Sequence, residues 1–284
     1  MNTAMECIPC FVRQAVEAVE MTDCDTALKE KLLRRILTEI ASSDWVAMPV
    51  VIAQRIQRMV REVSGNKDPY SGLKQKMNNI ALDLLPSLGA VIERQPDKRE
   101  ALVRLAIAGN LLDAGSKSRL ALEDLPARLR TIWDAPLAGS AGALFAAAEK
   151  ARSILYLADN AGEIVFDRLL IAALPLEKVK LAVRGFPVIN DATIKDAELA
   201  GLSGMVPVIS NGSDAPGTVL EECSEEFKAC FDVADMIISK GQGNYETLSG
   251  VDKNIFFLLS VKCSLIGSYI GAPVGALVVL NGKN

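Results

Sequence analysis

The chain has 284 residues, of which 50% are hydrophobic and 23% are charged, and this composition excludes collagen-like, low-complexity and largely disordered proteins. Its 31 basic and 35 acidic residues give a formal net charge of -4 without a basic block, so nucleic acid is not expected as a partner. The sequence contains no histidine, which excludes Ser-His-Asp and Cys-His catalysis and histidine metal ligands. Any metal would have to be held by oxygen or by thiolate.

Residues 1–115 show helical periodicity almost throughout and are predicted to form an all-helical N-terminal domain. Pro86 predicts a kink or a break in the fourth helical stretch, which follows Asp68-Pro69. A further helix is expected over residues 99–113. Residues 116–142 mix charged residues with turn residues and are predicted to be a linker.

Residues 143–284 are predicted to form an α/β domain, because short apolar runs alternate there with helical segments. This pattern indicates a mostly parallel, Rossmann-like sheet covered by helices. The expected strands are residues 154–158, 179–183, 206–209, 236–238, 255–259 and 276–280.

The most apolar region, residues 255–280, is expected to be buried core and not a membrane span. Lys262 lies within it, and glycines and a proline interrupt it. The first residues of the chain lack the cationic start and apolar stretch of a secretory signal, so a cytoplasmic location is expected.

Acidic residues follow the first two of these strands. Asp159, Asn160 and Glu163 come after residues 154–158, and Asp191 lies in the loop after residues 179–183. Because the carboxyl ends of parallel strands meet at one edge of a sheet, these side chains are expected to lie together and to suit a divalent cation such as Mg²⁺. Helix capping is the alternative, since Asn160 and Glu163 have capping-box spacing and Asp191 is equally suited to a cap.

Two further loops at the same edge suit phosphate binding. Residues 210–218 form a small, polar, glycine-containing run that includes Ser213 and Asp214, and Lys240 ends the fourth strand. A simple turn and a solvated lysine are the alternatives. The chain has no complete Gly-x-Gly-x-x-Gly or Walker pattern, which argues against a dinucleotide or P-loop nucleotide enzyme.

Taken together, the motifs of this chain resemble the DUF89 family, the damage-control phosphatases, and most closely its stand-alone prokaryotic members. The resemblance spans nearly the whole chain and rests on motifs at residues 6–10, 68–70, 109–113, 159–163, 190–193, 212–218 and 239–246.

The resemblance implies a divalent-metal-dependent phosphatase that hydrolyses small phosphorylated metabolites, such as sugar phosphates or phosphopantetheine-type esters. It implies Asp159, Asn160 and Asp191 as ligands of Mg, Mn, Co or Ni, and Lys240 as the phosphate-binding lysine. Asp159 and Lys240 are the predicted catalytic residues. The predicted substrate-binding residues are Asn110, Asp113, Glu163, Ser213, Asp214 and Lys262.

Several alternatives stay open at this point. Water activated by the metal and an aspartyl-phosphate on Asp159 are both compatible with the sequence. A carboxyl methyltransferase that uses S-adenosylmethionine and a non-catalytic metabolite-binding protein are the other candidate functions. Cys7 and Cys10 form a Cys-x-x-Cys motif, interpreted as a structural pair and alternatively as a zinc or redox site. The oligomeric state and the physiological substrate are not predicted.

Overall fold

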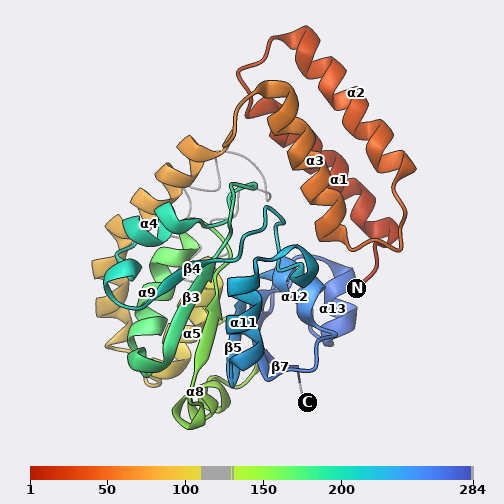
Figure 1. Cartoon of the computed structure of the whole chain (residues 1–284). Helices are drawn as coiled ribbons and strands as arrows, with labels where there is room; N and C mark the ends of the chain where they lie inside the picture. Colours follow the sequence, from red (N-terminus) through yellow and green to blue (C-terminus); the bar gives the residue numbers. More distant parts are fainter. Residues whose placement is uncertain (110–128, 130, 283–284) are drawn as a thin grey trace.

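The first three helices form a bundle with its own hydrophobic core. The computed structural model describes residues 1–109, 129 and 131–282, and Figure 1 shows this three-helix bundle at one end of the molecule. It comprises α1 (Ile8–Glu20), α2 (Thr26–Ser42) and α3 (Pro49–Ser64). Apolar residues at helical spacing, among them Phe11, Ile36 and Ile56, meet in its core.

The next two helices belong to the α/β part of the molecule. Both α4 (Ser71–Ile92) and α5 (Lys98–Ala108) contact α9 (Glu163–Ala172), and their apolar side chains lie in the same core as one face of the sheet. The division between hydrophobic cores therefore falls between α3 and α4, and not at the predicted boundary at residue 115. The helix α4 continues through Pro86, so the proline does not break it.

Among the described residues, seven strands form one sheet in the order β1-β7-β6-β5-β2-β3-β4, and all neighbouring pairs are parallel except β6 with β7. This confirms the predicted α/β fold class. The strands are β1 (Leu137–Gly139), β2 (Ile154–Leu157), β3 (Val179–Val183), β4 (Val208–Ser210), β5 (Met236–Lys240), β6 (Ile255–Ser260) and β7 (Leu277–Asn281). The strand β1 lies within the expected linker. It was not predicted, because three residues are too few for a recognisable pattern.

Helices cover both faces of the sheet. Because side chains alternate between the two faces along each strand, every strand contributes to a hydrophobic core on each side. In β2, Ile154 and Tyr156 point into the core shared with α4, α5 and α9, whereas Leu155 and Leu157 point into a second core. The remaining α-helices of the described residues are α8 (Ala141–Lys150), α10 (Ile194–Leu199), α11 (Glu225–Val233), α12 (Gln242–Leu248) and α13 (Ser264–Ile270).

The apolar region at residues 255–280 forms β6, α13 and β7, with β6 buried at the interior of the sheet. Among the described helices, none has the length and apolar character that crossing a membrane requires.

The strand order places β5, β2 and β3 side by side and parallel. Leu157, the last residue of β2, pairs with Ala182 on one side and with Ser239 on the other. The residues that follow these three strands therefore leave the sheet at one edge, where open α/β sheets commonly bind ligands.

Candidate active site

Backbone hydrogen bonds join the segment after β2 to the loop after β3. The Ala192 amide donates to the Asp159 carbonyl at 2.8 Å, and the Ala161 amide donates to the Asn190 carbonyl at 2.8 Å. An isolated antiparallel bridge between Asn160 and Asp191 lies between these bonds. The structure therefore brings the three predicted metal ligands together, although they come from separate loops.

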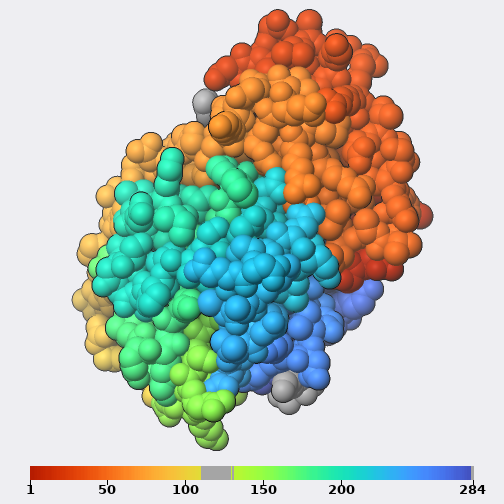
Figure 2. Space-filling view, in the orientation of Figure 1, coloured from red at the N-terminus to blue at the C-terminus, as the bar shows by residue number. Residues whose placement is uncertain are grey.

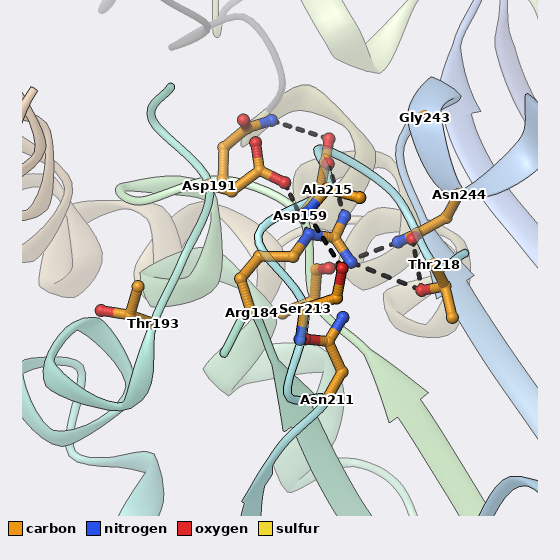
Figure 3. Close-up of polar contacts among 12 residues, drawn as sticks. Asp159, Arg184, Asp191, Thr193, Asn211, Ser213, Ala215, Thr218, Gly243 and Asn244 are labelled. Carbon is orange, nitrogen blue, oxygen red and sulfur yellow. Dashed lines mark hydrogen bonds and ion pairs between the residues drawn. The ribbon is translucent and has the colours of Figure 1, made fainter. Parts of the chain in front are cut away.

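Asp159 and Asp191 share one buried arginine, as Figure 3 shows. Arg184 Nε donates to Asp191 Oδ2 at 2.6 Å, and Arg184 Nη2 lies 3.8 Å from Asp159 Oδ1. All three residues are more than nine-tenths buried. The carboxylates therefore form a buried acidic pair that faces a single guanidinium in these contacts.

Gly241 allows the Asp159 side chain to take this position. Gly241 begins the turn from β5 into α12, and a Cβ atom added there would overlap the Asp159 carboxylate. Its backbone also has φ +79, a conformation that favours glycine. Asn160 Nδ2 also holds this carboxylate by donating to Asp159 Oδ2 at 2.7 Å.

The helix-capping alternative does not account for these polar residues. Gly162 is the N-cap of α9 and makes no side-chain cap, so Asn160 is not in the capping position. The capping box of α10 is formed by Thr193 and Asp196, and not by Asp191. Neither side chain caps a helix: the Asn160 amide bonds the Asp159 carboxylate, and the Asp191 carboxylate bonds Arg184.

The donor set suits a hard divalent cation. It combines two carboxylates with an amide side chain, and oxygen ligands are those that Mg²⁺ and similar ions prefer. In the part of the chain that the structure describes, no group of three or more Cys, Asp or Glu side chains is arranged to hold a metal. Metal binding by this mixed set stays a prediction.

Lys240 lies in a fully buried cluster. The alternation along β5 places its side chain on the face covered by α5 and α9. Its ammonium donates to Glu163 at 2.7 Å, to Asp167 at 2.5 Å and to the Ala106 carbonyl at 2.9 Å. A lysine ammonium has three hydrogens, so these partners account for all of them.

In this structure the Lys240 ammonium is bonded to two other carboxylates, so its role as the phosphate-binding lysine stays a prediction. Burial raises the pKa of Glu163 and Asp167, and Lys240 opposes this rise. Burial alone lowers a lysine pKa, but Asp167 and Glu163 raise the pKa of Lys240 above its usual value. Lys240 is therefore charged, and binding a phosphate would require it to exchange one of these partners.

Glu163, predicted to bind substrate, connects this cluster to the acidic pair. Its Oε2 accepts a hydrogen bond from Asn160 Nδ2 at 3.0 Å, while Oε1 accepts from Lys240. Gly109 lies directly against Glu163, where a Cβ atom on residue 109 would come 2.7 Å from its Cγ. Glu163 is fully buried and acts here as a bridge between the two groups.

The loop after β4, residues 211–218, packs against the start of α12. Ser213 is buried in it, and its hydroxyl accepts a hydrogen bond from the Ala215 amide at 3.1 Å. Thr218 donates to Asn244 Oδ1 at 2.8 Å and accepts a hydrogen bond from Arg184 Nη1 at 3.4 Å. This loop therefore supports Arg184 on the side away from the acidic pair (Figure 3).

Asp214, also predicted to bind substrate, faces the three-helix bundle. Its carboxylate accepts hydrogen bonds from Gln54 at 2.7 Å and from Arg58 at 2.6 Å, and it pairs with Arg61. Burial acts to raise the pKa of Asp214, but hydrogen bonds from Arg58 and Gln54 hold it below its usual value. Figure 2 shows the bundle in contact with the segment coloured cyan to blue, to which this loop belongs.

The other predicted residues lie apart or outside the described structure. Lys262 is exposed just after β6, where its charge acts on Glu246 of α12. Asn110 and Asp113 lie outside the described residues. Cys7 and Cys10 are thiols at the start of α1, and burial and nearby acidic groups, including Cys263, raise the pKa of Cys7.

Sequence reasoning did not assign a role to Arg184 or to Asp167. Arg184 follows directly after β3, so a charged residue at the end of a predicted buried strand was the available signal. Asp167 lies one turn after Glu163 on α9, and this i, i+4 spacing places two acids on one helical face.

Known proteins and one family profile match this chain over most or all of its length. The family profile described as "Damage-control phosphatase ARMT1-like domain" matches residues 3–278. The chain belongs to this family. This confirms the predicted resemblance.

Related proteins share both the sequence and the fold. A damage-control phosphatase of Pyrococcus horikoshii is 34% identical over 100% of this chain and 99% of its own length. A damage-control phosphatase of Archaeoglobus fulgidus is 32% identical over 98% of each chain. The crystal structure of a DUF89 family protein from Pyrococcus horikoshii superposes with a TM-score of 0.88, at 33% identity and with full coverage of both chains.

Proposed function

We propose that this protein is a divalent-metal-dependent phosphatase that hydrolyses phosphate monoesters of small metabolites. The observation that carries the proposal is the buried acidic pair of Asp159 and Asp191, placed beside Asn160 at the carboxyl ends of β2 and β3. Relatives that align over at least 98% of their own length are named damage-control phosphatases. Sugar phosphates and phosphopantetheine-type esters are the proposed substrate classes.

In this proposal Asp159, Asn160 and Asp191 hold the metal ion through oxygen atoms. When bound, such an ion supplies positive charge at the phosphoryl oxygens and lowers the pKa of a coordinated water. The chain itself keeps the ligands in place: Gly241 and Asn160 position Asp159, and the backbone bonds around Ala192 position Asp191. Burial of the acidic pair keeps competing water away and strengthens its interaction with cations.

The experiment is a phosphatase screen with metal-stripped protein across sugar phosphates, phosphopantetheine-type esters and other phosphometabolites. Mg²⁺, Mn²⁺, Co²⁺ and Ni²⁺ are then added back one at a time. We expect phosphate release only with metal present. Release that persists at the same rate in chelator would contradict the metal dependence, and no release with any ester and any ion would contradict the phosphatase activity.

The same protein is tested for methyl transfer from S-adenosylmethionine. The segment from Asp159 to Glu163 contains only one glycine, Gly162, whereas a cofactor-binding turn of that kind is glycine-rich. We therefore expect no methyl transfer. Methyl transfer without phosphate release would favour the methyltransferase alternative.

A further inference from the structure

Arg184 is a buried cation with an unused hydrogen-bonding position. Its side chain is 2% exposed, and its Nε is bonded to Asp191 while its Nη1 is bonded to Thr218. Nη2 is buried and has no hydrogen-bond partner among the described residues. Asp159 Oδ1 lies 3.8 Å from Nη2, which is beyond hydrogen-bonding distance.

A buried donor without an acceptor is costly in a folded protein, so this one indicates a missing ligand atom. A second buried donor, Asn211 Nδ2, also has no hydrogen-bond partner among the described residues. Asn211 lies beside Arg184 in Figure 3, and its Oδ1 accepts a hydrogen bond from the Gly185 amide at 2.9 Å. Unpartnered donors on Arg184 and on a residue bonded to its neighbour Gly185 favour an anion with several acceptor oxygens.

The charges around Arg184 change sign when a divalent cation is added. Asp159 and Asp191 carry two negative charges when ionised, and Arg184 reduces the sum to -1. A divalent ion bound by the two carboxylates changes this sum to +1. The two added positive charges favour the binding of a phosphate group beside Arg184.

We propose that Arg184 has two roles: it is the counter-ion of the acidic pair in the metal-free protein, and it binds the phosphoryl group once metal is present. The inference rests on the metal-dependent activity proposed above. A guanidinium suits this role because it keeps its charge at all relevant pH values and offers a planar fork of donors to phosphate oxygens. Thr218 and Asn244 hold the fork in place from behind.

Two binding affinities therefore depend on Arg184 in opposite directions. As a counter-ion it competes with metal for Asp191, so removing its charge tightens metal binding. As a phosphate ligand it attracts the anion, so removing its charge weakens phosphate binding. A merely structural arginine would weaken both or change neither.

The test uses titration calorimetry on the full chain, with Mn²⁺ added to metal-stripped protein and inorganic phosphate added to Mn²⁺-loaded protein. In Arg184→Met we expect Mn²⁺ to bind at least about tenfold more tightly. We expect phosphate to bind about 10- to 100-fold more weakly, the effect of losing a hydrogen bond to a charged group. Arg104→Met is the matched control, because Arg104 is largely buried and bonds Glu100, Ile132 and Ala135.

Unchanged phosphate affinity in Arg184→Met would overturn the phosphate role, and unchanged or weaker Mn²⁺ binding would overturn the counter-ion role. Should Arg184→Met not fold, Arg184→Lys keeps the charge but not the fork. We then expect Mn²⁺ affinity within about threefold of the parent value and a smaller thermal shift with phosphate. An equal shift in both proteins would contradict the proposal.

These measurements require no turnover, so they separate this inference from the proposed function. A parent protein that binds Mn²⁺ and phosphate as described but hydrolyses no ester would contradict only the phosphatase activity. A parent protein that binds no Mn²⁺ would contradict the metal site and the role of Arg184 together.

Discussion

Gly241 is a residue whose replacement tests the position of the Asp159 carboxylate. Gly241→Ala places a methyl group on that carboxylate and also strains a backbone with positive φ. We expect Mn²⁺ binding to weaken by about tenfold or more, measured by calorimetry, with the overall fold retained by circular dichroism. Gly250→Ala is the control, because no atom lies within 4 Å of its added Cβ. Equal Mn²⁺ affinity in both variants would show that the metal does not depend on Asp159.

The charges of the acidic pair have separate effects on activity and on stability. Asp159→Asn and Asp191→Asn each remove one negative charge from the proposed metal shell, so we expect each to lose most phosphatase activity. The metal-free Asp159→Asn variant should keep the thermal stability of the parent, because Arg184 retains its 2.6 Å bond to Asp191, whereas Asp191→Asn breaks that buried ion pair and should be less stable. Activity assays and thermal unfolding measure the two effects. Full activity in either variant would contradict the metal-ligand assignment.

Replacing Lys240 tests whether this lysine is a structural cation or a phosphate ligand. Lys240→Met leaves Glu163 and Asp167 buried without their cation, so we expect a loss of about 3–5 kcal/mol in the free energy of unfolding, measured with denaturant. Lys150→Met, at an exposed position, should change stability by less than about 0.5 kcal/mol. A stable Lys240→Met protein that has lost only phosphate binding would support the direct contact that the sequence predicts.

At the scale of elements, the helix α3 holds the loop after β4 through one carboxylate. Gln54, Arg58 and Arg61 all lie on α3 and all contact Asp214. The same loop reaches the start of α12, where the backbone of Gly217 lies against Gly243. The bundle is therefore linked to the loop after β4 and to the start of α12 through a short series of polar and backbone contacts.

The contacts of the Asp214 carboxylate with α3 predict that the protein loses thermal stability at low pH. The folded-state pKa of Asp214 is lowered, so its contribution is present above its unfolded pKa of about 3.9 and is lost as pH falls through the lower folded value. Thermal unfolding between pH 3 and 6 should show the parent protein losing more stability than Asp214→Asn over this range. Parallel curves for the two proteins would contradict a stabilising role of the Asp214 carboxylate.

The individual strands are the elements that sequence reasoning locates best. The runs at 179–183 and 255–259 correspond closely to β3 and β6, because buried parallel strands are continuous apolar segments with clear ends. The sequence also places Asp159, Asn160 and Asp191 at one sheet edge, since parallel topology alone determines that edge. It does not identify Arg184 as their partner, because that contact depends on how two loops fold onto each other.

At the scale of the whole molecule, the division into domains was harder to predict. Helical periodicity is the same in α3 and α4, yet α3 packs within the bundle and α4 packs on the sheet. The pattern shows that each helix has an apolar face but not which surface covers that face. The same ambiguity applies to Lys240, whose position at a strand end was clear while its partners on α5 and α9 were not.

Because β2 and β5 lie at the centre of the sheet, they should be among the last segments to unfold locally. Central strands buried on both faces exchange their amide hydrogens last, whereas a small bundle with a separate core can detach by local unfolding. Asp159 follows the first of these strands and Gly241 follows the second. A form of the protein with the bundle opened would thus retain Asp159 in its position, whereas the loop of Asp191 would lose its contacts with the bundle through Pro187 and Ile189.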